Sequence, residues 1–79
     1  MAIEYKRSTA IFSGIIAVDD AQELFEWLQK RKNPKINLLE CTHLHTADLQ
    51  VIMALKPEVV KWPEDKSLDI WLRNILTDK

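Results

Sequence analysis

The alternation of apolar and polar residues at the start of the chain predicts a β-hairpin. Residues 3–6 (Ile-Glu-Tyr-Lys) follow the period of two that is typical of a half-buried strand. Arg7 and Ser8 suit a two-residue turn, and residues 9–13 read as the second arm of the hairpin. Gly14 fits a bulge or a bend before the chain continues toward the next element.

A helical period of apolar residues follows between two boundary signals. Asp19 and Asp20 are good helix starters, because each has a Gln or Glu three residues later and a carboxylate suits the positive end of the helix dipole. Residues 30–32 are basic, which favours the negative end, and Asn33-Pro34 stops the helix. The expected core-facing stripe consists of Ala21, Leu24, Phe25 and Leu28.

The middle of the chain predicts a buried strand, a loop and a second helix. Residues 36–39 (Ile-Asn-Leu-Leu) form an apolar run too short for a helix, which favours a strand buried on both faces. Residues 40–45 have mixed character and are predicted as a loop. Residues 46–55 have helical spacing, and Lys56-Pro57 ends this helix. Its apolar stripe is expected to consist of Leu49, Ile52 and Met53.

The last third of the chain predicts one more strand and one more helix. Residues 58–62 are β-prone, and Pro63 ends that run. A final helix, capped by Asp65 or Ser67, carries an apolar stripe of Leu68, Trp71, Leu72, Ile75 and Leu76. The order β-β-α-β-α-β-α predicts an α/β fold with a four-stranded mixed sheet and three helices, because the hairpin is antiparallel and the later crossovers are parallel.

Length and charge narrow the possible functions. Seventy-nine residues suffice for one domain, residues 1–79. A net charge of −1 argues against binding nucleic acid or an anionic membrane surface. The apolar run of residues 9–18 is interrupted by polar residues and is shorter than the ~20 residues of a transmembrane helix, so we expect neither membrane insertion nor a secretory signal. A single Cys fits a reducing compartment, and we expect a cytoplasmic protein.

The chain has no signature of a known catalytic site. It lacks a G-x-S-x-G, a P-loop and a G-x-G-x-x-G, and its single Gly excludes a glycine-rich phosphate loop. A Cys41–His43 nucleophile pair is conceivable, but such close neighbours in one segment rarely have the required geometry. We therefore expect no enzymatic activity and no cofactor. Of the tryptophans, Trp71 is expected in the core, whereas Trp27 and Trp62 are expected to be half-exposed, with Trp27 a candidate partner contact.

Candidate chemistry gathers where the predicted strand leads into the helix at Thr46, because ligands of open α/β sheets bind beyond the carboxyl ends of the strands. In one interpretation Thr46 is simply the helix N-cap and Asp48 complements the dipole. In another, Thr46 carries a phosphate, which the positive end of the helix tolerates and which would expel a docked partner. In a third, Cys41, His43 and His45 point the same way from an extended segment and hold a metal such as zinc.

A family resemblance favours the second interpretation. The order of elements, the segments Ile36-Asn-Leu-Leu-Glu40 and Leu44-His-Thr-Ala-Asp-Leu49, and Val18-Asp-Asp-Ala-Gln-Glu-Leu24 before them resemble the STAS domain of bacterial anti-sigma-factor antagonists. The family's phosphorylated Ser or Thr falls on Thr46, its acidic residue on His45 and its glycine on Asp48. The resemblance covers roughly residues 3 to 76 and indicates a divergent, minimal STAS-like protein.

The resemblance implies a non-enzymatic protein-interaction module of bacterial signalling. Its expected partner is an anti-sigma factor or a similar serine kinase. The resemblance also allows a homodimer. The expected centre of contact comprises Leu44, His45, Thr46, Ala47 and Asp48, with Gln50 and Val51 at its margin. The alternative is a small-ligand or metal-binding domain at the same junction, near Cys41, His43 and His45.

Overall fold

A computed structural model describes residues 2–76. Its elements are, in chain order, β1 (Ile3–Tyr5), β2 (Thr9–Ile16), α1 (Asp20–Lys30), β3 (Lys35–Leu44), α2 (Thr46–Leu55), β4 (Glu58–Lys61) and α3 (Lys66–Leu76). This order confirms the predicted α/β fold with a four-stranded mixed sheet and three helices. No helix within residues 2–76 is long and apolar enough to cross a membrane.

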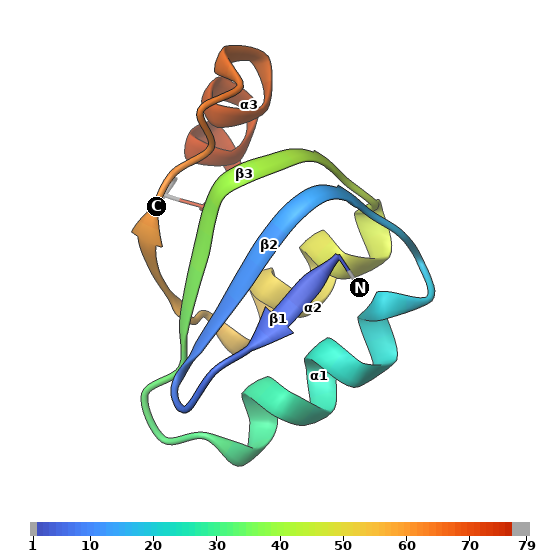
Figure 1. Cartoon of the computed structure of the whole chain (residues 1–79), viewed down its shortest axis with the longest axis vertical. Helices are drawn as coiled ribbons and strands as arrows, with labels where there is room; N and C mark the ends of the chain where they lie inside the picture. The colour runs from blue at the N-terminus through green and yellow to red at the C-terminus, as the bar shows by residue number, and fades with distance from the viewer. Residues whose placement is uncertain (1, 77–79) are drawn as a thin grey trace.

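The strands lie in the spatial order β1-β2-β3-β4, with the first pair antiparallel and the other two pairs parallel. In Figure 1 the strands pass in front of α2, and α3 stands at one end of the molecule. Inward-facing side chains of β2 and β3 form the core with the helices. The fully buried members include Phe12, Ile16, Leu24, Ile36, Leu38 and Leu72.

The strand β3 is much longer than the sequence predicts, because two bulges break its alternation. Ala10 lies opposite Ile36, Gly14 opposite Cys41 and Ile16 opposite Leu44, so β3 has one residue more than β2 in each of these two intervals. Residues 40–44 were predicted as a loop, and that prediction was wrong: they continue the strand.

All three helices turn a slightly different face to the core from the one predicted. In α1 the buried side chains are those of Leu24, Trp27 and Leu28, whereas Phe25 is partly exposed. In α2 Leu49 and Ile52 are buried, and Met53 is 45% exposed. Only the placement of the stripes, not the existence of the helices, differs from the prediction. The predicted stripes each included one residue that lies at the edge of the buried face.

Candidate functional site

The start of α2 lies at the carboxyl end of β3, as predicted, and Thr46 is exposed there as the first residue of the helix. The capping residue is nevertheless His45, not Thr46. Its imidazole Nδ1 accepts a hydrogen bond of 3.0 Å from the Ala47 N–H. The prediction of Thr46 as N-cap was therefore wrong, because a neighbouring side chain already satisfies a backbone donor of the first turn.

Asp48 occupies a different place from the one expected of a contact residue. Its side chain is completely buried, and neither carboxylate oxygen has a hydrogen-bond partner among residues 2–76. Burial raises the pKa of the Asp48 carboxyl to about 6; the nearby charge of Asp20 adds to this rise, and that of His45 opposes it. A polar group buried without a hydrogen bond weakens the fold, and it does so most when it is charged.

Only part of the predicted centre of contact is accessible at the surface. Leu44 is buried in the core and Asp48 is buried beneath the first turn of α2, which corrects their placement on the contact surface. His45 and Thr46 are exposed and Ala47 is half-buried, so these three remain available to a partner. At the expected margin, Gln50 is exposed and Val51 is half-buried.

The three candidate metal ligands do not face the same way. The first bulge of β3 turns Cys41 into the core, and the second follows it, whereas His43 and His45 are exposed. The Cys41 Sγ donates a 3.5 Å hydrogen bond to the His43 carbonyl oxygen, and burial raises the pKa of this thiol to about 11. The expectation that the three side chains point together was therefore wrong. Within residues 2–76 no group of three or more His, Cys, Asp or Glu side chains is arranged to hold a metal ion.

A groove opens beside Thr46, between the starts of α2 and α3. It has a volume of about 680 Å³ and combines hydroxyl, imidazole and apolar groups. We call it the docking groove. Its lining comprises Thr42, His43, Leu44, His45, Thr46, Asp65, Ser67, Leu68 and Trp71.

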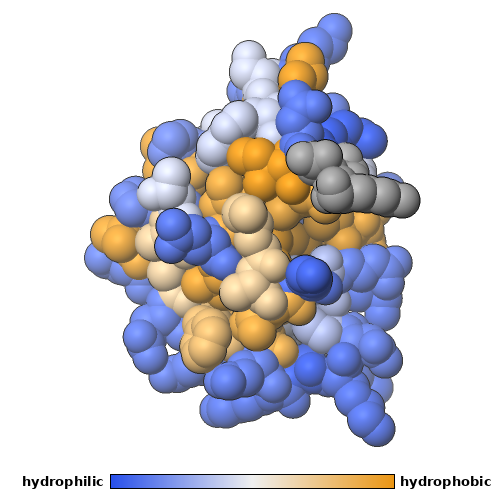
Figure 2. Space-filling model, turned by 180° about the vertical axis from the view of Figure 1, so that it is seen from behind, coloured by the Kyte–Doolittle hydropathy of each residue, from blue (hydrophilic) through white to orange (hydrophobic). Residues whose placement is uncertain are grey.

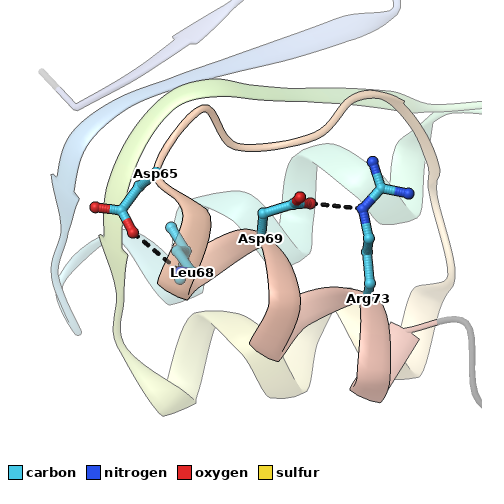
Figure 3. A network of polar contacts seen from close by, with 4 residues as sticks. All are labelled: Asp65, Leu68, Asp69 and Arg73. Atoms are coloured by element: carbon cyan, nitrogen blue, oxygen red, sulfur yellow. Dashed lines mark hydrogen bonds and ion pairs between the residues drawn. The ribbon is translucent and has the colours of Figure 1, made fainter.

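The wall contributed by α3 was not foreseen as part of the site. Asp65 Oδ1 accepts a 3.0 Å hydrogen bond from the Leu68 N–H, which confirms Asp65 as one of the two predicted caps of this helix. Figure 3 shows Asp65 where the chain enters α3, beside the ribbon of β3, and one turn later the 2.6 Å pair of Asp69 and Arg73. The capping signal at Asp65 was present in the sequence, but nothing there indicated that α3 would begin next to α2.

The burial of Trp27 and Trp71 is the reverse of the prediction. Trp71 is 40% exposed and lines the docking groove, although it was expected in the core. Trp27, the expected partner contact, is only 9% exposed, with its ring 5.3 Å from that of Tyr5 and the Arg31 guanidinium 4.5 Å from its centroid. Trp62 is half-buried beneath Arg73. The exposed tryptophan, which is the best anchor for a partner, is therefore Trp71.

A further hollow of about 510 Å³ lies between the last turns of α2 and α3. Its lining is apolar apart from Lys56. The exposed side chains of Met53 and Ala54 on α2 continue this apolar surface. The one charged residue of α2, Asp48, is buried and does not interrupt it. Figure 2, which views the molecule from the side of α2, shows the apolar residues gathered near the centre of this face. Contiguous exposed apolar surface of this kind is typical of interaction sites.

No protein-family model matches the chain, and no curated protein matches its sequence.

Proposed function

We propose that this protein is a non-enzymatic interaction module that docks another protein on the docking groove and the adjoining first turn of α2. The observation that carries the proposal is the position of Thr46, exposed on the rim of a groove that also presents the indole of Trp71. An exposed aromatic side chain beside polar groups is the usual anchor of a protein interface. The outer face of α2, which is uncharged and carries the exposed side chains of Met53 and Ala54, supports the same function.

Phosphorylation of Thr46 would switch this docking off. Thr46 is the first residue of α2, where the positive end of the helix dipole tolerates added negative charge. The helix would therefore stay folded while the rim of the groove gained up to about two negative charges at Thr46. The carboxylate of Asp48 lies buried beneath the same turn and does not share the exposed surface with the phosphate.

By its resemblance to anti-sigma-factor antagonists, the partner is an anti-sigma factor or another serine kinase of bacterial signalling. The module would then work in the cytoplasm, where such kinases act. The order of strands and helices is compatible with this assignment. His45 caps the helix at the position of the family's acidic residue, so the cap does not require a carboxylate.

The proposal is tested by capture from cells that encode the chain, with tagged wild type and the Thr46→Ala, Thr46→Glu and Trp71→Ala variants. We expect Thr46→Ala to retain the captured partner, and Thr46→Glu and Trp71→Ala to lose at least tenfold of it. Intact-mass measurement after incubation with that partner and ATP should show one phosphate on the wild type and none on Thr46→Ala.

A matched control is Lys32→Ala, which changes an exposed residue in the turn after α1, away from the groove lining. The docking proposal fails if Thr46→Glu and Trp71→Ala capture the same proteins as Lys32→Ala in the same amounts. The switch alone fails if docking depends on Trp71 but no phosphate is found on Thr46.

A further inference from the structure

The strand β3 has a free edge along its second half. Its neighbour β4 pairs only with Lys35, Ile36 and Asn37, and Pro63 follows soon after β4 ends. Proline has no N–H to donate and rarely continues a strand within a sheet. Past that point the Glu64 N–H donates a 3.0 Å hydrogen bond to the Leu39 carbonyl oxygen, and the chain then turns into α3. Of the strands within residues 2–76, none pairs with residues 40–44 on this side.

A second, smaller groove runs along this free edge. It has a volume of about 410 Å³, and we call it the edge groove. It meets the docking groove at Thr42 and Asp65, which line both. The lining of the edge groove comprises Leu39, Glu40, Cys41, Thr42, Glu64 and Asp65.

The charges of the edge groove have a single sign. Glu40, Glu64 and Asp65 line it, and its lining contains no lysine or arginine. No described residue forms an ion pair with Glu40 or Glu64. An acidic lining attracts a basic segment and repels an acidic one. A second copy of the same edge would bring the same carboxylates, so edge-to-edge pairing of two copies is disfavoured.

We propose that the free edge of β3 binds a short, extended, basic peptide segment of a partner protein, which adds a strand beside residues 40–44. Backbone hydrogen bonds would supply the affinity in this mode of binding, and the carboxylates of the groove would select lysine or arginine at alternate positions. The two bulges limit the regular part of the edge, so the added strand would be short. The site goes beyond the switch at Thr46 and does not require it.

The test uses the full chain labelled with ¹⁵N and the peptide acetyl-Lys-Val-Lys-Val-Lys-amide as the probe. We expect saturable shifts of the amide signals of residues 39–44 and 64–65. The peptide in which Glu replaces Lys should bind at least tenfold more weakly. The Lys peptide with every backbone nitrogen methylated keeps the charges but cannot pair as a strand, and it should not bind measurably.

Paired variants separate the acidic groove from the net charge of the molecule. The double variant Glu40→Gln/Glu64→Gln should weaken binding of the Lys peptide about fivefold or more. Glu4→Gln/Glu26→Gln, which removes the same charge outside the groove, should leave binding within twofold of wild type. Equal weakening by both double variants, undiminished binding of the methylated peptide, or shifts confined to other residues would each overturn the proposal.

The outcome is independent of docking at Thr46. Thr46→Glu should leave binding of the Lys peptide unchanged even where it abolishes capture of the partner. Conversely, Glu40→Gln/Glu64→Gln should weaken binding of the Lys peptide whether or not Thr46 is ever phosphorylated.

Discussion

At the scale of the residue, the most consequential group is the buried carboxyl of Asp48. Its pKa is raised to about 6 by burial, whereas an unfolded Asp titrates near its ordinary value of 3.8. Between these two values the folded protein binds more protons than the unfolded chain, so its free energy of unfolding falls as the pH rises through this window. The loss is then complete above pH 6 and amounts to roughly 2 to 3 kcal/mol.

We therefore expect Asp48→Asn to stabilise the fold at pH 8, by about 1 to 3 kcal/mol, and to have much less effect at pH 4. The amide keeps the shape of the side chain and carries no charge. Urea unfolding at both pH values measures the difference. Asp19→Asn, an exposed residue before α1 without a capping hydrogen bond, serves as the control. A stability gain that is the same at pH 4 and pH 8 would contradict the burial of an ionised Asp48.

His45 allows a second prediction at this scale. Because its Nδ1 accepts from the Ala47 N–H, His45→Ala leaves this backbone donor of α2 without its side-chain acceptor and should lower the free energy of unfolding by about 1 kcal/mol. His45→Ser supplies a hydroxyl acceptor and should keep most of the stability. Thermal unfolding of the two variants beside wild type provides the comparison, and equal losses in both would show that the imidazole does not act as a cap.

At the scale of the element, the sequence pattern predicts the three helices but not the second half of β3. The helices were predictable because their apolar periods lie between capping and stop signals, as at Asp19 and Pro34. The second half of β3 was not, because its inward residues Leu38, Cys41 and Leu44 are three apart and obey neither the strand nor the helix period. Bulges are set by pairing with a neighbouring strand, which a single segment does not reveal.

The same limit applies to the candidate site. Thr46 was placed correctly at the start of a helix beyond a parallel strand, since that follows from the order of elements alone. The burial of Asp48 depends on how α2 packs beside α1, and the exposure of Trp71 depends on how α3 lies against the rest of the molecule. Such rotations about a helix axis are decided by tertiary packing, which the apolar stripe determines only approximately.

Gly14 gives a prediction for β2. Its φ of 67° lies in the left-handed region, and no atom lies within 4 Å of the position that a Cβ would occupy. Replacement by Ala therefore meets no clash but must hold an unfavourable backbone conformation, at a cost of about 1 to 2 kcal/mol. Asn tolerates this conformation better, so Gly14→Asn should lose less stability than Gly14→Ala in urea unfolding. The opposite ranking would contradict the left-handed conformation at this position.

At the scale of the whole molecule, the chain builds two layers, and only one face of its sheet is covered by helices within residues 2–76. Phe12 and Ile16 of β2 lie under the helices, whereas Ile15 and Leu39 are exposed on strands of the same sheet. The two grooves lie where the covering layer ends, at the start of α3. The docking groove and the free strand edge are therefore neighbours, and they share the lining residues Thr42 and Asp65.

The two bulges of β3 also determine how the chain enters α2 at Thr46, through the number of residues that they add to the strand. Each extra residue reverses which of the following positions point toward the core. The second one restores the original alternation, so that Leu44 points into the core. A chain shortened by one residue between Leu38 and Leu44 could keep Leu44 opposite Ile16 by losing one bulge, because β3 has one residue more than β2 in each of the two intervals. The accessibility of the hydroxyl at the start of α2 is thus set by the pairing of Leu44 with Ile16, and we expect the segment before it to accommodate the loss of one residue at a bulge.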